Sequence, residues 1–189
     1  MSETNFHNFE TISRFSEPKQ GKTGTDSAQS ETTSLDERFY QAAVRGEQKD
    51  CEALLAAGAA VDFQEPRRGS SEGNNALHGA IVNQFSTRKK AAFLAWLIDT
   101  GIDVDQRNAA GRTPLHEAAE KGDARAVTVL LRAGADPSLR CADGMTAEQL
   151  GGRSFHNRAV TEAFSVHAAR VRLDHLLQLV PSGGTARAE

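Results

Sequence analysis

The segment GRTPLHEAAEKGDARAVTVLLRAG, residues 111–134, carries the strongest structural signal in this 189-residue chain. Thr113 and Pro114 suit the start of a helix, because a hydroxyl can cap free amides there and the missing N–H of proline costs little. Gly122 permits a tight turn, and Gly134 can end a second helix in the left-handed conformation. Apolar residues at helical spacing lie on both sides of Gly122. The segment therefore predicts a hairpin of two helices.

This hairpin is one unit of a repeat. Three similar endings, LLAAGAAVD, LIDTGIDVD and LLRAGADPS, occupy residues 54–62, 97–105 and 130–138, and Gly111 and Gly144 open successive units one period apart. A fixed period of 33 residues, as from Gly111 to Gly144, is the signature of a solenoid. The pattern TPLHxAAxxG followed by VxxLLxxGAD resembles the ankyrin repeat, which implies an all-α stack of helical hairpins.

The outer units depart from this pattern. Residues 39–62 keep the AAxxG and LLxxGA elements but lack TPLH, and we interpret them as an N-terminal capping repeat. The fourth unit opens DGMTAEQLGG at residues 143–152, where Glu148 and Gln149 replace the usual Leu-His pair. We interpret this unit as a C-terminal cap, because the end units of a solenoid must cover its apolar faces.

The second unit, which contains NALHGAI at residues 75–81, carries two insertions of five residues each. The segment EPRRGSSEG, residues 65–73, would lengthen the loop that enters this unit, and NQFSTRKK, residues 83–90, would lengthen the turn between its helices. Extra residues on one face of a solenoid often belong to its binding side. We expect exposed side chains in these insertions at Arg67, Arg68, Phe85, Arg88, Lys89 and Lys90.

The expected fold class is thus an all-α ankyrin-repeat solenoid of about four helix-turn-helix units with short β-hairpin-like loops, a C-terminal helical cap and a disordered N-terminal tail. The repeats occupy residues 35–154, with units at about 35–64, 65–107, 108–140 and 141–165.

The tail, residues 1–34, is rich in polar residues and poor in aliphatic ones, so we expect it to be disordered. Phe6, Phe9, Ile12 and Phe15 recur every three residues and could form a docking peptide on a short induced helix. The alternatives are a stripe that rests on the protein's own repeats, one without a role, or a secretion address.

Residues 155–180 carry apolar side chains at helical spacing, among them Val160, Phe164, Leu173 and Leu177. One long helix, or two, should close the stack, with a disordered end at residues 181–189. Dimerisation through this helix is the alternative. We expect a monomer rather than a homodimer.

Composition excludes several functions. A net charge of −3 and a pI near 6.1 argue against general nucleic-acid binding. Cys51 and Cys141 lie in no disulfide or zinc spacing. Neither a signal peptide nor a long apolar run is found, so we expect a cytoplasmic protein without a membrane role.

No nucleophile motif, metal motif or phosphate-binding loop occurs, and we expect no catalytic residue, no cofactor and no metal. His78 and His116 fall at the histidine of the ankyrin tetrapeptide, and the resemblance implies a local bond to the backbone rather than catalysis. The alternative is a small enzyme or enzyme subunit with a site in the insertions or C-terminal helices, which loss of activity on mutating His156 or Cys141 would reveal.

The resemblance also implies where a partner binds, because ankyrin repeats usually grip proteins with their loop tips and the concave face of their first helices. Arginine recurs at the matching positions, so we expect a protein partner with an acidic contact surface. An ordinary solvated row of charges is the alternative. Such binding could inhibit the partner, as in an immunity-type blocker or a delivered effector, or scaffold it. The expected partner-binding residues are Arg45, Arg67, Arg68, Asn83, Phe85, Arg88, Arg107, Arg112, Glu120, Lys121, Arg140, Met145 and Arg153.

Overall fold

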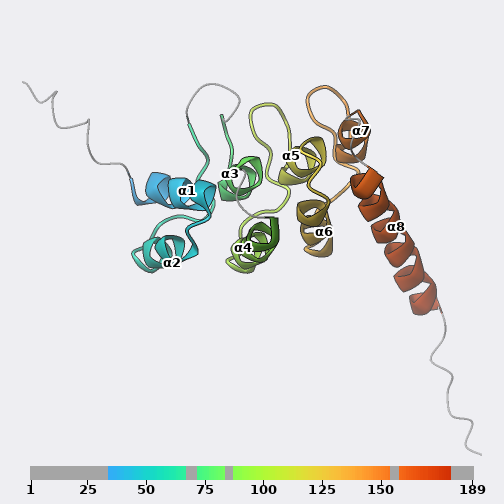
Figure 1. The fold of residues 1–189 in the computed structure, drawn as a ribbon, viewed down its shortest axis with the longest axis horizontal. Coiled ribbons are helices and arrows are strands. Elements are labelled where there is room, and N and C mark those ends of the chain that lie inside the picture. The colour runs from blue at the N-terminus through green and yellow to red at the C-terminus, as the bar shows by residue number, and fades with distance from the viewer. Residues whose placement is uncertain (1–33, 67–71, 84–86, 154–157, 180–189) are drawn as a thin grey trace, which may run out of the picture. The chain divides into compact units, whose positions relative to one another are not determined.

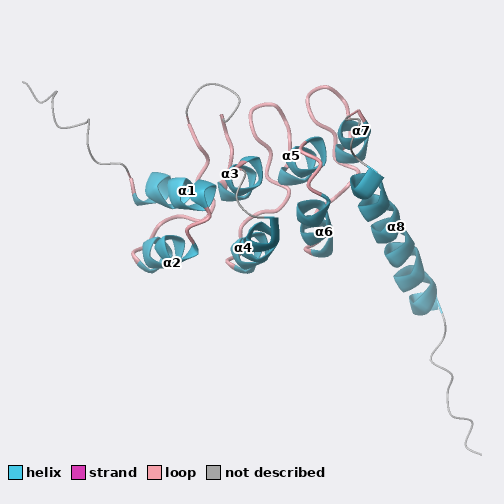
Figure 2. Ribbon diagram, in the orientation of Figure 1, coloured by secondary structure: helices cyan, strands magenta, loops and turns pink. Residues whose placement is uncertain are grey.

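The computed structural model describes residues 34–66, 72–83, 87–153 and 158–179. Within these ranges the chain forms eight helices joined by loops (Figures 1 and 2). The helices are α1 (Leu35–Arg45), α2 (Gln48–Ala56), α3 (Ala76–Val82), α4 (Thr87–Asp99), α5 (Pro114–Glu120), α6 (Ala124–Arg132), α7 (Ala147–Gly152) and α8 (Arg158–Leu179).

The helices pack as successive hairpins in two layers (Figure 1). One layer consists of the first helix of each unit, with α3 between α1 and α5, and α5 between α3 and α7. The second helices α4, α6 and α8 pack in the same order in the other layer, while α2 packs on α1. The core lies between the layers and includes the fully buried side chains of Phe39, Leu77, Leu94, Leu115 and Leu130. The predicted all-α repeat solenoid is confirmed.

Three first helices begin in the same way, with a reciprocal capping box. The residue before each helix, Asn75, Thr113 or Thr146, accepts a hydrogen bond from the third backbone N–H, and the side chain at that third position accepts one from the cap residue. The third position is His78 in α3, His116 in α5 and Gln149 in α7. Gln149 therefore performs the capping role of the repeat histidine in the degenerate fourth unit.

The loops between α4 and α5 and between α6 and α7 are short hairpins (Figure 2). The N–H of Asn108 donates to the carbonyl oxygen of Arg112 at 2.9 Å, and at the equivalent place in the next loop the N–H of Cys141 donates to that of Met145 at 3.0 Å. The described residues contain one isolated β-bridge, between Arg140 and Thr146. These loops are β-hairpin-like, as predicted.

The two insertions have different outcomes. In the loop entering the second unit, the N–H of Glu65 donates to the carbonyl oxygen of Asn74, closing a hairpin that is longer than the one between Asn108 and Arg112. The prediction of a longer loop is confirmed there. The second insertion does not simply lengthen a turn, because α4 already begins at Thr87 and has 13 residues where α6 has 9. Most of its extra length extends the helix.

The fourth unit is completed by α8, which packs on α6 and α7 as the second helix of that unit. Val160 and Phe164 of its first turns are buried, whereas Val171, Leu173 and Leu177 are exposed. The apolar residues that we expected to close the stack therefore do so only in the first half of the helix. No helix within the described ranges combines the length and apolar content required to cross a bilayer.

Several expectations fall outside the described residues. They concern the N-terminal stripe of Phe6, Phe9, Ile12 and Phe15, the C-terminal end at residues 181–189, and His156. These expectations stay predictions.

Candidate partner-binding surface

Four of the expected binding residues lie at the C-terminal ends of the first helices, although Arg153 comes one residue earlier in its unit than Asn83 and Lys121 do in theirs. Arg45 is the last residue of α1, and Asn83, Lys121 and Arg153 are the C-cap residues of α3, α5 and α7. We call these four the helix-end row. Its three cations lie where the helix dipole favours positive charge. Asn83 also links two units, because its side-chain amide donates to the carbonyl oxygen of Val44.

Two arginines form a second set, at equivalent places in successive loops. A guanidinium N–H of Arg107 donates to the carbonyl oxygen of Arg140 at 2.7 Å, and one of Arg140 donates to that of Gly144 at 2.7 Å. Both residues are exposed. These hydrogen bonds to carbonyl oxygens hold the two arginine side chains in place but do not neutralise their charges. Both guanidinium groups therefore stay charged and have a fixed orientation. We call Arg107 and Arg140 the loop pair.

Arg153 connects the helix-end row to the loop between α6 and α7. Its guanidinium Nη1 lies 3.2 Å from the Sδ atom of Met145. The carbonyl oxygen of Met145 in turn accepts a hydrogen bond from Cys141 N–H. Met145, which we expected in the surface, is half-buried and serves mainly to hold the loop and orient Arg153.

Two cations of the surface, Arg45 and Arg112, have carboxylate partners within the protein, and Nη1 of Arg45 lies 3.2 Å from Oε2 of Glu47. Arg112 is the less exposed of the two. Its Nη1 lies 2.6 Å from Oε2 of Glu120 and 3.6 Å from Oε1 of Glu117, and the side chains of Arg112 and Glu117 are 23% and 10% exposed. Burial raises the pKa of Glu117, and the nearby guanidinium of Arg112 opposes that shift. Arg112 and Glu120, both expected to touch a partner, therefore form an ion-pair cluster along α5 that also buries Glu117.

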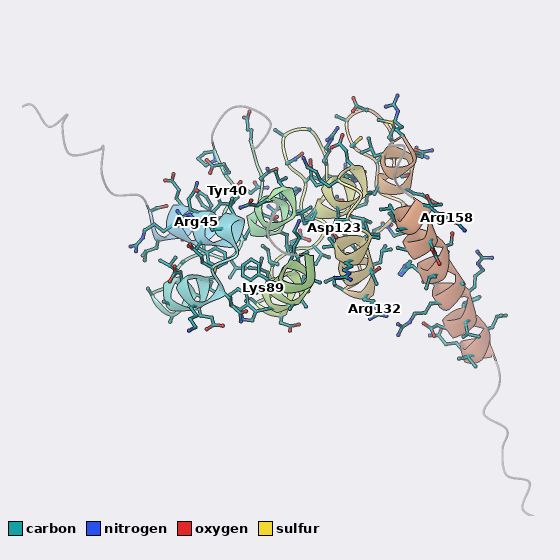
Figure 3. All side chains as sticks on the ribbon, in the orientation of Figure 1. Tyr40, Arg45, Lys89, Asp123, Arg132 and Arg158 are labelled. Atoms are coloured by element: carbon teal, nitrogen blue, oxygen red, sulfur yellow. The ribbon has the colours of Figure 1, made fainter. Side chains whose placement is uncertain are left out.

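The structure shows the positions of only some of the binding residues that we expected in the two inserted segments. Arg67, Arg68 and Phe85 lie outside the described residues, as does the side chain of Arg88. Lys89 is exposed on α4, where Figure 3 labels it. Our expectation for Lys90 was wrong. Its side chain is buried and its Nζ lies 3.3 Å from Oδ2 of Asp123, because the start of α4 turns it toward α6.

Sequence reasoning did not identify Glu117 or Asp123 as partners of these cations. Arg112 precedes α5, so its contacts with Glu117 and Glu120 follow no helical spacing. Lys90 and Asp123 are one repeat period apart. Lys90 lies on α4, the second helix of its unit, whereas Asp123 is the N-cap residue of α6, the second helix of the next unit. The repeat period could have suggested that Lys90 faces the start of α6, had the insertion not obscured the register.

The two repeat histidines are structural. His116 Nδ1 accepts a hydrogen bond from Thr113 N–H at 3.2 Å, and its Nε2 lies 3.2 Å from the carbonyl oxygen of Met145 in the next unit. His78 has the same arrangement, with Nε2 at 3.0 Å from the carbonyl oxygen of Arg112. Burial lowers the pKa of both imidazoles, that of His78 to about 4, so they are neutral at pH 7. The family resemblance implied the hydrogen bond of each histidine to the backbone of its own helix start. The contact of each Nε2 with a carbonyl oxygen of the next unit was not expected.

The described residues contain no cluster of three or more His, Cys, Asp or Glu side chains arranged to hold a metal ion. Cys51 is buried in the core, and burial raises its pKa to about 12, so its thiol remains protonated. Cys141 is buried as well rather than placed at an exposed loop tip.

Comparison with known proteins agrees with this architecture. The family described as ankyrin repeats (three copies) matches residues 39–141. The chain is 31% identical to mouse ankyrin repeat domain-containing protein 37 over 104 residues, which are 55% of this chain and 60% of that protein. It is 38% identical to the human protein of that name over 60 residues, 32% of this chain and 38% of that protein.

A longer relative matches this chain over a small share of its own length. The chain is 39% identical to the mouse nuclear factor NF-kappa-B p105 subunit over 84 residues, 44% of this chain and 8% of that protein. The chain thus spans less than two thirds of the curated relatives it matches. Together with two layers of helical hairpins, capping histidines and hairpin loops, the match over residues 39–141 shows that the chain belongs to the ankyrin-repeat family.

Proposed function

We propose that this protein is a non-catalytic binding module that holds a partner protein against the first-helix layer and the loops of its second and third units. Ankyrin repeats are generally protein–protein interaction modules, and proteins built from them are typically non-catalytic. The carrying observation is the regular placement of cations in this chain. Arg107 and Arg140 recur at the same register position in successive loops, and Lys121 and Arg153 are the C-cap residues of α5 and α7.

The partner presents carboxylates to this surface. The guanidinium groups of the loop pair keep free N–H donors after binding their backbone acceptors, and a guanidinium can bind a carboxylate with two parallel hydrogen bonds. Arg112 contributes less directly, since Glu117 and Glu120 already compensate its charge. Inhibition of the partner, as by an immunity-type blocker or a delivered effector, is one use of such a grip, and recruitment in the cytoplasm is another.

The test is affinity capture with the full chain from a lysate of its native source. We compare the wild type with the double variant Lys121→Glu/Arg153→Glu, in which both changed residues are exposed. The matched control is Lys49→Glu/Lys89→Glu, which makes the same change of charge at exposed residues on the second helices α2 and α4. Capture should be lost in the first variant and kept in the control, with equal melting temperatures.

Retention of the captured protein by Lys121→Glu/Arg153→Glu would exclude this surface. Equal loss in both double variants would show that only overall charge matters. An activity assay on the captured protein, with and without the chain, then separates inhibition from recruitment.

A further inference from the structure

Helix α8 (Arg158–Leu179) has two apolar faces, and the stack covers only one of them. Val160 and Phe164 are buried against the repeats. Val166, Leu173 and Leu177 are 63%, 56% and 62% exposed. Residues seven and eleven positions apart lie on the same side of a helix, so these three form one stripe, well rotated from the buried face. We call Val166, Leu173 and Leu177 the α8 stripe.

A groove between α6 (Ala124–Arg132) and α8 leads into this stripe. Its volume is about 300 Å³. Apolar side chains line both walls, with Leu131 contributed by α6 and Ala163 and Val166 by α8. A second cleft shares Leu131 with the groove and extends along α8 to Val171. That second cleft is lined mainly by polar and charged side chains, among them Arg132, Arg170 and Asp174. The apolar groove therefore ends beside Val166, from which the α8 stripe continues on the same side of the helix.

The rim of this groove is basic. Arg125 and Arg132 line it from α6, and Arg170 lines it from α8, against one acidic residue, Glu162. Within the described ranges Arg125 and Arg132 have no ion-pair partner, and Arg170 has a distant one, with 4.0 Å between its Nε and Oδ2 of Asp174. Figure 3 labels Arg132 at the end of α6. Within the described residues, the three arginines of the rim outnumber the acidic side chains near them, Glu162 and Asp174, so the rim carries a net positive charge.

We infer that the α6–α8 groove and the α8 stripe form a second docking surface, which takes an amphipathic helix with acidic flanks from a partner protein. A helix that enters such a groove contributes apolar anchors at positions i, i+3, i+4 and i+7, which match the repeat of the stripe. Its Glu or Asp side chains meet Arg125, Arg132 and Arg170. This surface lies on the second-helix layer, so it is separate from the helix-end row and independent of the function proposed above.

The charge of the rim distinguishes this occupant from a second copy of the chain. Two copies joined along their α8 stripes would bring together helices that each carry Arg158, Arg170 and Arg172 against Glu162 and Asp174. Like charges at such a contact oppose association. An acidic helix gains from the same cations.

Three labelled peptides of about 18 residues, long enough to form a helix, test the inference by fluorescence anisotropy with the full chain. The first has Leu at i, i+3, i+4 and i+7 with Glu on its flanks, the second has Lys in place of Glu, and the third is the acidic peptide in scrambled order. The acidic amphipathic peptide should bind at least about tenfold more tightly than the other two, and high salt should weaken it.

The variants Arg125→Glu/Arg132→Glu and Leu173→Gln/Leu177→Gln should each weaken that peptide by about tenfold or more. All four residues are exposed, so the melting temperature should not fall. Lys49→Glu/Lys89→Glu is the charge-matched control and should bind as the wild type does. Equal binding of the lysine peptide, or binding that neither groove variant weakens, would overturn the inference.

Two other occupants would also overturn it, and each has its own measurement. Sedimentation that shows a dimer, dispersed by Leu173→Gln/Leu177→Gln, would assign the stripe to a second copy. Flotation with vesicles of anionic phospholipid, lost in the same variant, would assign it to a membrane surface. We expect a monomer that stays with the protein fraction in both measurements.

Discussion

Lys90 and Asp123 form an ion pair between α4 and α6, with 3.3 Å between Nζ and Oδ2 and only 9% of each side chain exposed. The pair connects the second unit to the third. Lys90 also donates to the carbonyl oxygen of Ile81, and the other carboxylate oxygen of Asp123 accepts from Ala126 N–H as the N-cap of α6. The side chain of Asp123 therefore both caps α6 and binds the cation of the neighbouring unit.

Removal of one member of this pair should destabilise the protein strongly. Lys90→Met leaves a buried carboxylate without its cation, and we expect the free energy of unfolding to fall by about 3 kcal/mol. Urea titration followed by circular dichroism measures the loss. The double variant Lys90→Met/Asp123→Asn keeps an oxygen to cap α6 and should recover part of it. A double variant as unstable as the sum of the single ones would argue against direct coupling.

Acid should weaken the stack through His78. Its pKa is lowered to about 4 in the folded protein from an ordinary value of 6.5, because burial disfavours the imidazolium. The unfolded chain therefore binds the proton first, and this contribution to stability is complete above pH 6.5 and is lost as the pH falls toward 4. Between pH 7.5 and pH 5 the loss from His78 amounts to about 2 kcal/mol.

The measurement is the free energy of unfolding at both pH values for the wild type, His78→Gln and His175→Gln. Glutamine already caps α7 at Gln149, so His78→Gln keeps the capping box and removes the titrating group. The destabilisation on acidification should be smaller in His78→Gln than in the wild type, whereas His175→Gln, at an exposed position, should behave like the wild type. Identical pH profiles for all three proteins would refute the role of His78.

Gly79 should tolerate no side chain. A Cβ atom there would lie 2.6 Å from Cγ2 of Val44 and 3.2 Å from Cε2 of Tyr40, where α3 packs on α1. Gly79→Ala gains helix propensity of up to about 1 kcal/mol, but overpacking costs about 1 to 3 kcal/mol, so we expect a net loss of about 1 kcal/mol. Thermal melts measure it. Adding Val44→Ala should relieve the clash, so the double variant should lose less stability than the two single variants lose together. A loss equal to the sum of the two single losses would show that the contact with Val44 is not the cause.

Arg112 should be a residue of stability more than of binding. Arg112→Met leaves Glu117 with a buried carboxylate, and we expect a loss of about 1 to 2 kcal/mol at pH 7. The loss should be smaller at pH 5 than at pH 7, because burial raises the pKa of Glu117 and removal of the guanidinium raises it further, so a larger fraction of the carboxyl group is protonated at the lower pH. Lys121→Met, at an exposed helix end, is the control and should lower stability clearly less than Arg112→Met does. A loss that is equal at both pH values would exclude this explanation.

The repeat pattern predicted the fold well because local signals and the period agree. Thr113, Pro114 and Gly122 set the ends of α5, and Thr146 caps α7 at the equivalent place in the next unit. The length of the first inserted loop also followed from spacing alone. The second insertion could not be placed, because polar residues before Trp96 fit a loop or a helix equally, and the contact of Lys90 with Asp123 favours the helix.

The candidate surface was less predictable than the fold. Sequence position identified which residues lie at helix ends and loops, such as Lys121 and Arg140, since those places follow from the repeat. It could not show which cations are already paired, because Arg112 meets Glu117 through the packing of a loop on α5. Sequence position also could not show which face of α8 is buried and which is exposed. The length over which α8 is covered depends on the length of α6, against which it packs.

Site-specific photocrosslinking determines whether a partner protein binds the first-helix layer. A photoreactive side chain replaces Lys121 at the end of α5 in one variant and Lys49 on α2 in another, both at exposed positions. Each full chain is irradiated in a lysate of its native source and analysed by mass spectrometry. We predict one discrete protein adduct from position 121 and none from position 49. No adduct from position 121, or the same adduct from both positions, would refute binding at this layer.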